Sequence, residues 1–485
     1  MISSAEDRAR LDVKLTKNQE ECINSKANNL LIKGIAGSGK TLVLLRKAVK
    51  LKREAINNKE NIKIGFFTYA NTLTRYSQDL VNEIEDNNGM ISVNTFHSHG
   101  LSILKNINTT RKLNIIYGSY KDDILKNSIN QMKIVYSTNK ILNKELDFWI
   151  EEISWIKGKK IYDKDSYINT SRIGRGTSYR LTKKDKEVVF KVYEDYNKRL
   201  RKSNKIDFDD ISNLILDNFE FVPRDKRFDY VLVDEAQDLS YCQLLVLKML
   251  AKKSIIIAAD HAQKIYNNSF TWKELGINVQ GNASKSLGKN FRSTKEIMNL
   301  ANSLIVKNES NKGRDTDYEL GKDVDGEGNK PIIYKCNTIT KENEIMVELL
   351  KELNDGETVI GIPVRTNSKV KRSVIKALND NNLEWEEVSK EKDVPWSILT
   401  PGIKVVTMHS AKGLEFDVVI IPRVNDGMIP KIDENEDDEA MLEQERSLLY
   451  VAMTRAKEDL YLITSKGSRF IDEMDRRLYE MDKIQ

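Results

Sequence analysis

Short runs of β-branched and other apolar residues alternate with amphipathic segments along most of the chain. Each run has the length of one buried strand, and the segments between the runs carry apolar residues at helical spacing. This alternation is typical of parallel α/β layers. The runs that predict strands are Asn29–Lys33, Ile62–Thr68, Tyr230–Val233, Ser254–Ala259, Thr358–Pro363, Ile403–Thr407, Val418–Pro422 and Leu460–Thr464.

The predicted strands fall into two sets, separated by a seam near Gln280–Leu287. A long, strongly charged stretch with helical periodicity interrupts the first set. The length of 485 residues agrees with about three domains. The expected domains are a first α/β core at 1–100 and 206–285, a helical, basic insertion at 101–205 and a second α/β core at 286–485.

Composition narrows the protein class without changing this architecture. Hydrophobic residues make up 40% of the chain, which is enough for globular cores and excludes wholesale disorder. The net charge of +5 is compatible with a polyanionic partner. Cys22, Cys242 and Cys336 are too far apart for a disulfide framework or a paired-cysteine zinc site. The N-terminus lacks the apolar core of a signal peptide, and no apolar run is long enough to span a membrane, so we expect a cytoplasmic protein without a membrane partner.

A glycine-rich segment after the first predicted strand fits the pattern GxxxxGK[ST]. In such a loop the backbone N–H groups surround a phosphate, Lys40 neutralises the β- and γ-oxygens of ATP, and Thr41 ligates Mg²⁺. The alternative is a chance glycine-rich turn, but strand, loop and helical segment follow one another in the order that the motif requires. The predicted nucleotide-binding residues here are Gly34, Ile35, Ala36, Gly37, Ser38, Gly39, Lys40 and Thr41.

Two acidic residues follow the apolar run Phe228–Val233. Ligands of parallel sheets bind at the carboxyl ends of strands, so we expect Asp234 to hold Mg²⁺ and Glu235 to polarise the attacking water. A strand-end acid is often only a helix cap. Together with Lys40, however, the pair predicts ATP hydrolysis.

The segment Asp234–Asp238 (DEAQD), together with the phosphate-binding loop, resembles superfamily 1A DNA helicases of the UvrD/Rep/PcrA family. Further segments match motifs of this family in the right order, and they cover both halves of the chain. The resemblance implies an α/β fold of two RecA-like, parallel-sheet P-loop NTPase domains in tandem, with a helical accessory insertion in the first. The matching segments are Leu15–Ile23, Phe66–Thr74, Asn94–Ser98, Ala258–Tyr266, Leu287–Thr294, Val405–Pro422 and Glu445–Leu462.

The resemblance also implies roles around ATP. Two arginines of the second core would reach the transferring phosphoryl group when the cleft between the cores closes. Taken alone, each arginine could equally be a surface or structural residue. The implied roles are adenine recognition by Gln19, base stacking by Phe291, γ-phosphate sensing by Gln263, arginine fingers at Arg292 and Arg455, and nucleotide contacts by Gly413 and by Glu415, the latter to the ribose.

A track for a single strand is implied in the same way. Stacking by Tyr266 would be sequence-tolerant because every base offers a π-face. The chain departs from the family after this residue, where relatives usually have a Trp-Arg pair; Phe270 and Trp272 come slightly later and could equally be core aromatics. The residues that match contact motifs are Thr68, Tyr69, Asn71, Thr95, His97, Tyr266 and His409.

The interval between Arg292 and His409 is short for this family. The large helical subdomain that relatives insert there is expected to be absent or vestigial, which puts processive unwinding in doubt. We expect an ATP- and Mg²⁺-dependent translocase or helicase that moves 3′-to-5′ on single-stranded DNA, with RNA as a possible partner. The alternatives are an ATPase or regulatory subunit of a nuclease or phage-defence complex, and an ATPase that remodels RNA or a polymerase.

Overall fold

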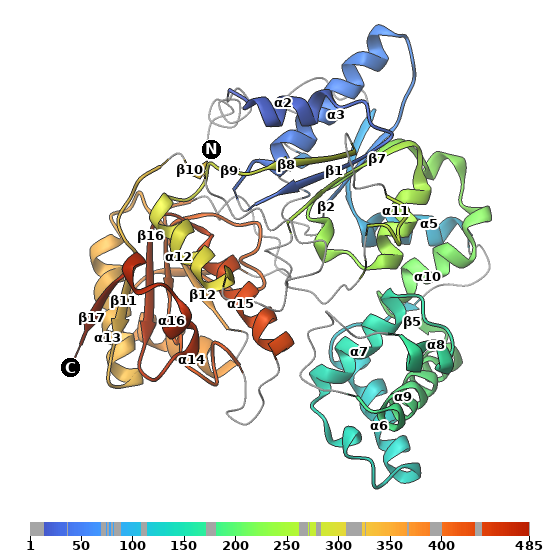
Figure 1. Cartoon of the computed structure of the whole chain (residues 1–485). Helices are drawn as coiled ribbons and strands as arrows, with labels where there is room; N and C mark the ends of the chain where they lie inside the picture. The colour runs from blue at the N-terminus through green and yellow to red at the C-terminus, as the bar shows by residue number, and fades with distance from the viewer. Residues whose placement is uncertain are drawn as a thin grey trace. The chain divides into compact units, whose positions relative to one another are not determined.

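The chain forms two compact units in the computed structural model (Figure 1). One unit comprises Met1–Leu31, Leu42–Ala258 and Asn267–Lys285, and the other comprises Ile32–Thr41, Ala259–Tyr266 and Ser286–Gln485. No helix among the described residues is long and apolar enough to cross a membrane. The residues that the structure describes are 14–35, 37–68, 74, 77–78, 81, 89–107, 114–170, 181–260, 270, 272–277, 283–306, 323–324, 326–365, 368–388, 400–431 and 439–484.

The first sheet has six strands in the order β3-β2-β6-β7-β1-β8. The pairs β2–β3, β2–β6 and β6–β7 are parallel, and all five residues of β2 are buried, as expected for a strand covered on both faces. Its strands are β1 (Asn29–Gly34), β2 (Ile64–Thr68), β3 (Ile91–Thr95), β6 (Phe228–Val233), β7 (Ala251–Ala259) and β8 (Ser284–Leu287).

Two strands of this sheet were not predicted. In β3, buried and partly exposed residues alternate, as is usual at a sheet edge, and the apolar run is therefore broken. β8 has only one buried residue, Leu287, and lies in the stretch that we expected to be a seam. Ser284–Leu287 joins the first sheet as a strand, and the division between the two compact units falls within it, between Lys285 and Ser286, inside the expected seam.

Helices join these strands, and a helical bundle is inserted among them (Figure 1). The bundle has its own core, which includes Trp149, Tyr167 and Tyr196. The expected boundary at residue 101 falls inside α5, so the bundle follows that helix. The helices around the sheet are α2 (Lys17–Asn24), α3 (Lys40–Asn57), α5 (Phe96–Ile107), α10 (Asp210–Asp217), α11 (Tyr241–Leu250), η2 (Phe219–Phe221), η3 (Arg224–Lys226) and η4 (Ala236–Asp238). The insertion contains β4 (Asn114–Ile115), α6 (Ser119–Val135), η1 (Lys140–Asn143), α7 (Leu146–Gly158), α8 (Lys164–Asn169), α9 (Lys183–Lys202) and β5 (Lys205–Ile206).

The second unit is built on a seven-stranded sheet with the order β13-β14-β12-β15-β16-β11-β17, whose neighbouring pairs are parallel. The strands are β11 (Ile332–Lys335), β12 (Val359–Val364), β13 (Trp385–Val388), β14 (Gly402–Thr407), β15 (Phe416–Ile421), β16 (Ala456–Thr464) and β17 (Glu480–Lys483), beside a small β9 (Lys289–Asn290) and β10 (Asp323–Val324) pair. The helices are α12 (Lys295–Val306), α13 (Ile339–Leu353), α14 (Ser368–Asp380), α15 (Glu439–Met453), α16 (Arg469–Glu473) and η8 (Arg476–Leu478).

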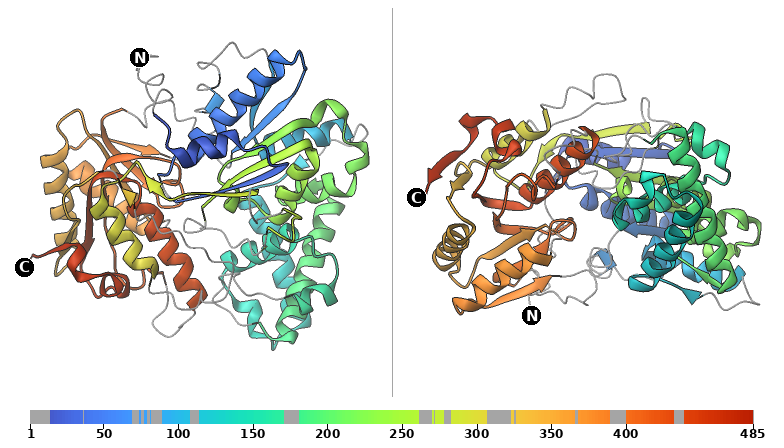
Figure 2. Two further views of the ribbon diagram at one scale, coloured as in Figure 1. Left: turned by 45° about the horizontal axis from the view of Figure 1, so that its top comes forward. Right: turned by 90° about the horizontal axis from the view of Figure 1, so that it is seen from below.

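Helices cover both faces of the second sheet (Figure 2). Along β15, Val419 and Ile421 belong to the core under α12, α15 and α16, whereas Val418 and Ile420 belong to the core under α13 and α14. Successive side chains of a strand point to opposite faces, so a strand between two helical layers must be apolar at every position. The two parallel α/β domains that we predicted are thereby confirmed.

Candidate functional site

The phosphate-binding loop runs from the end of β1 to the first residue of α3, and three of its positions favour glycine. A Cβ on Gly34 would lie 2.6 Å from Ser38 Oγ and 2.7 Å from Lys40 Cγ. Gly37 and Gly39 have φ angles of 68° and 79°, in the left-handed region that side chains disfavour. The result is a tight turn at the N-terminus of α3, which suits an anionic ligand.

Lys40 is buried at the head of this loop. Its ammonium donates to the carbonyl oxygens of Gly34 at 3.0 Å and Ile35 at 2.8 Å. It also forms an ion pair with Asp260, which follows β7, at 3.4 Å. The lysine is therefore held against the loop that it is predicted to serve.

Within the second unit, the loop packs against the segment Leu287–Arg292. The Ile35 N–H donates to the Leu287 carbonyl at 3.3 Å, and the Phe291 N–H donates to the Gly37 carbonyl at 3.0 Å. A Cβ on Gly37 would lie 2.7 Å from the Cβ of Arg292. Residues from two predicted motifs far apart in sequence therefore meet at this loop.

We expect Gly37→Ala to lower both stability and ATP affinity. The new methyl group meets Arg292 Cβ, which cannot rotate away, so overpacking should cost about 1–3 kcal/mol beyond the roughly 1–2 kcal/mol of a left-handed alanine. The matched control is Gly89→Ala, where φ is 75° but nothing lies within 4 Å of the new Cβ. Denaturant unfolding and nucleotide titration of both variants test this; equal losses of stability and affinity would contradict the close approach.

Asp234 and Glu235 come directly after β6, as predicted. Asp234 is fully buried, and its backbone N–H donates to the Phe67 carbonyl of the neighbouring strand at 2.8 Å. Glu235 has φ 50° and ψ 41°, a left-handed conformation that is rare outside glycine. Backbone strain of this kind is concentrated at functional sites. A carboxylate such as that of Asp234 and a hydroxyl such as that of Thr41 are the kinds of oxygen ligand that Mg²⁺ prefers.

Arg292 is paired with Glu415. The arginine Nε and Nη2 lie 2.8 Å and 2.7 Å from the same carboxylate oxygen. The attraction of Arg292 holds the pKa of Glu415 at about 2, so the pair is ionised at neutral pH. The Asn290 side-chain oxygen fixes the backbone nearby by accepting from the N–H groups of Arg292 and Ser293. The predicted arginine finger and the predicted ribose contact are thus partners of each other.

Arg455 is only 1% exposed. It lies between α15 and β16, where its Nε donates to the Val451 carbonyl at 3.0 Å and Nη2 donates to the Thr454 hydroxyl at 3.3 Å. The arginine therefore supports the packing of its own unit in addition to its predicted role.

The other predicted nucleotide contacts are placed as follows. Gln19 is buried in α2, and its side-chain oxygen accepts from the Thr16 N–H at 3.0 Å in a capping box. The Phe291 ring is exposed, with the Lys289 ammonium 5.4 Å from its centre. Gly413 has φ 86° in the turn before Glu415. Ala36 and Gln263 lie outside the described residues.

In the first unit, the residues predicted to contact single-stranded nucleic acid lie at the carboxyl ends of neighbouring β-strands. Thr68 ends β2 and is the register partner of Thr95, which ends β3. The Thr95 hydroxyl accepts from the Ser98 N–H at 3.2 Å and so helps to start α5, which carries His97. His409 follows β14 in the second unit. Tyr69, Asn71 and Tyr266 lie outside the described residues.

Phe208 was not predicted, although it packs directly on His97. The ring centres are 5.1 Å apart in an edge-to-face arrangement, and Phe208 remains 37% exposed. Burial lowers the pKa of His97 against the opposing effect of Asp209, so its ring is neutral at neutral pH. An aromatic residue flanked by acids just after the basic insertion was the available sequence signal. Phe270 and Trp272, by contrast, pack edge-to-face on each other at 5.5 Å.

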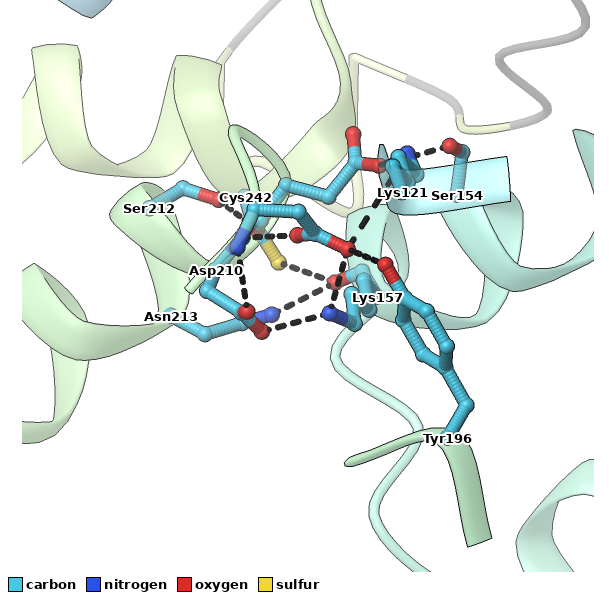
Figure 3. Close-up of polar contacts among 10 residues, drawn as sticks. Lys121, Ser154, Lys157, Tyr196, Asp210, Ser212, Asn213 and Cys242 are labelled. Atoms are coloured by element: carbon cyan, nitrogen blue, oxygen red, sulfur yellow. Dashed lines mark hydrogen bonds and ion pairs between the residues drawn. The ribbon is translucent and has the colours of Figure 1, made fainter. Parts of the chain in front are cut away.

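A buried ionic cluster anchors the segment that carries Phe208 (Figure 3). The Lys157 ammonium lies 2.8 Å from Asp207 and 2.7 Å from Asp210, and the Tyr196 hydroxyl donates to Asp207 at 2.8 Å. Burial alone would lower the pKa of Lys157, but the two carboxylates outweigh it and raise the pKa. The cluster thereby joins α7 and α9 of the insertion to the start of α10.

Asp209, the residue after Phe208, is also bound by side chains of the insertion. The Asp209 carboxylate accepts from the Ser154 hydroxyl at 2.6 Å and from the Lys121 ammonium at 3.3 Å. Asp207 and Asp209, the two neighbours of Phe208 in sequence, are therefore both bound to the insertion. The Phe208 ring between them is partly exposed.

We expect Lys157→Met to destabilise the protein by about 3 kcal/mol, because the fully buried Asp207 loses its close cation and keeps only Lys121 at 3.9 Å, and the partly buried Asp210 loses its ion pair. The matched control is Lys191→Met, which removes an exposed ion pair with Glu194 and should have an effect near zero. Denaturant unfolding of both variants measures the difference. Equal stabilities would show that the cluster is not a structural anchor.

Comparisons with known proteins agree with this geometry. Residues 15–270 match the UvrD/REP helicase N-terminal domain, and residues 286–394 and 389–467 match the UvrD-like helicase C-terminal domain. The chain is similar to the ATP-dependent DNA helicase PcrA of Staphylococcus aureus, with 26% identity over 78% of this chain and 51% of the relative. For PcrA of Leuconostoc citreum the identity is 25%, over 78% and 50%. For a probable DNA helicase II homolog of Mycoplasma capricolum it is 27%, over 66% and 44%.

The chain spans about half the length of the curated relatives that it matches. The N-terminal domain model alone covers more than half of the chain, and the C-terminal model matches most of the rest. The matched regions contain the phosphate-binding loop, the Asp234–Glu235 pair and both predicted arginine fingers. The chain therefore belongs to the UvrD/REP helicase family.

Proposed function

We propose that the protein is an ATP-dependent DNA translocase with helicase activity that moves 3′-to-5′ along a single strand. The observation that carries the proposal is the phosphate-binding loop, in which buried Lys40 closes on Gly34 and Ile35 while the loop packs against the segment that carries Arg292. The names of the matched relatives, which are ATP-dependent DNA helicases, supply the substrate class.

Hydrolysis would use residues from several elements. The loop N–H groups and Lys40 would bind the phosphates of ATP. Thr41 and Asp234 would hold Mg²⁺, which neutralises phosphate charge when bound. Glu235 would orient the attacking water and accept its proton. Gln19 and Phe291 would contact the base.

The arginines would act on the charge that develops at the transferring phosphoryl group. Arg292 is already bound to a carboxylate, and a phosphate can replace Glu415 because both anions accept the same pair of guanidinium N–H groups. Glu415 would then be released to contact the ribose. This exchange links the state of the nucleotide to the second unit.

The strand would lie over the carboxyl edge of the first sheet, where Thr68 and Thr95 are neighbours. Phe208 and His97 would support bases there through their rings. Since His97 is neutral, its contribution would come from packing and hydrogen bonding rather than from charge. Tyr69, Asn71, Tyr266 and His409 are further contacts that the family resemblance implies.

We propose that unwinding by the isolated chain is poor. Between Arg292 and His409, the described segments form α12, β10–β14, α13 and α14, nearly all of them parts of the second core and its sheet. A large helical subdomain that grips duplex is not among the described residues of this interval. This observation also favours the alternative of an ATPase subunit within a larger nuclease or defence complex.

The test begins with ATPase rates without nucleic acid and with single-stranded DNA or RNA. We expect stimulation by DNA, and affinity that falls with salt by about 0.7 log units per log unit for each phosphate contact. Single-turnover displacement of 3′- and 5′-tailed duplexes, with a trap for free protein, then measures unwinding and polarity. Stimulation by RNA alone would favour the RNA-remodelling alternative, and efficient separation of a long duplex by one monomer would contradict the proposed limit on unwinding.

A further inference from the structure

Two exposed tyrosines and a lysine stand beside Phe208 at the entrance to the helical insertion. Tyr117 is 70% exposed and Tyr120 is 47% exposed. The Lys205 ammonium donates to the Tyr120 hydroxyl and lies 3.7 Å from the centre of the Tyr120 ring. We call Tyr117, Tyr120 and Lys205 the tyrosine ridge.

The backbone places this ridge next to Phe208. Strands β4 and β5 pair in parallel, with Ile115 opposite Ile206, and the Ile116 N–H extends the ladder by donating to the Ile206 carbonyl at 2.9 Å. Tyr117 and Phe208 each follow this pair by two residues. Their rings therefore lie on the same side, with centres 6.2 Å apart and planes inclined by 35°.

A series of ring contacts connects Tyr117 to His97, one of the residues predicted to contact single-stranded nucleic acid. Tyr117 lies beside Phe208, and Phe208 lies beside His97 of α5. Stacking platforms for single strands have this composition, with successive aromatic faces and a cation for the phosphates.

The acidic residues on either side of Phe208 are each bound by side chains of the insertion. Asp209 is engaged by Lys121 and Ser154, and Asp207 is engaged by Lys157. The Lys205 side chain adds a partly exposed cation, and α9 ends in further basic residues just before it. A nucleic-acid backbone is the partner that matches exposed aromatic rings bordered by cations.

We propose that the tyrosine ridge is a second binding site for the single strand, which extends the track from His97 and Phe208 onto the insertion. Tyr117 stacks on a base, and Lys205, held by its hydrogen bond to the Tyr120 hydroxyl, binds a phosphate. The proposal rests on the proposed function, because it lengthens the strand-binding site of the same motor.

The experiment compares Tyr117→Ala, Lys205→Ala and the conservative Tyr117→Phe with the parent chain. Equilibrium anisotropy with single strands of increasing length, at several salt concentrations, measures affinity, and 2-aminopurine placed along the strand reports stacking. The matched control is Phe221→Ala, which removes a 63% exposed aromatic side chain outside the ridge. Thermal unfolding confirms that each variant is folded.

We expect Tyr117→Ala to lower the affinity for long strands on the order of tenfold, with loss of one stacking signal, and Tyr117→Phe to restore both. Lys205→Ala should reduce the salt slope by about 0.7. The ridge would be overturned if these variants kept the parent's single-strand affinity and salt dependence while Phe208→Ala bound the strand more weakly. The proposed function would not be affected by that result. Absence of single-strand binding by the parent chain would overturn both.

Discussion

Glu235→Gln is expected to bind ATP normally and to hydrolyse it about 10²- to 10⁴-fold more slowly, because only the group that we propose as acceptor of the proton from the attacking water is lost. Glutamine keeps the size of the side chain and can accept the same hydrogen bond from Gln237 that the carboxylate accepts. The left-handed backbone at this position constrains glutamine as it does glutamate. The variant should therefore change the rate of ATP hydrolysis without changing the local structure.

Nucleotide titration and steady-state ATPase rates with saturating single-stranded DNA provide the measurement. Lys40→Ala offers the contrast, since it should weaken ATP binding itself. Glu194→Gln on α9, at the exposed ion pair with Lys191, is the matched control and should leave both quantities unchanged. Turnover at the parent rate in Glu235→Gln would assign the base to another residue.

Arg292→Ala and Arg455→Ala should each reduce DNA-stimulated ATPase activity by about 10³-fold or more, the loss typical of arginine fingers. The two variants should also differ in their free energy of unfolding. Arg292 forms an ion pair with Glu415 that is partly accessible to water, whereas Arg455 is almost fully buried among carbonyl oxygens of its own unit. Arg455→Ala should lower the free energy of unfolding more than Arg292→Ala, by about 1–3 kcal/mol, because its buried acceptors lose their donor whereas Glu415 is partly accessible to water.

Stimulated ATPase rates and denaturant unfolding of both variants test this pair of statements. Arg477→Ala, which removes an exposed arginine bound to Asp475, is a control for the loss of a guanidinium group. A parent-like stimulated rate in Arg455→Ala would remove this arginine from the proposed site. Equal stability of the two finger variants would show that the burial of Arg455 contributes little.

Structural features that depend only on residues close together in sequence could be predicted from the sequence alone. The phosphate-binding loop is defined by glycines within eight residues of a strand and a helix, and β1 and α3 are where that spacing predicts them. Asp234 follows β6 because a strand buried on both faces is an unbroken apolar run whose end can be read directly. The same reasoning failed for β3 and β8, whose partly exposed positions interrupt the apolar pattern.

Only the tertiary structure decided which distant side chains meet. Arg292 and Glu415 are 123 residues apart and pair because β9 and the turn before β15 converge within one unit. Phe208 becomes part of the candidate strand site because its acidic neighbours are anchored to Lys157 and Lys121, 50 and 88 residues away. Sequence periodicity reports which face of an element is apolar, whereas the partner of a charged or aromatic side chain depends on how separate elements pack, and no local pattern contains that information.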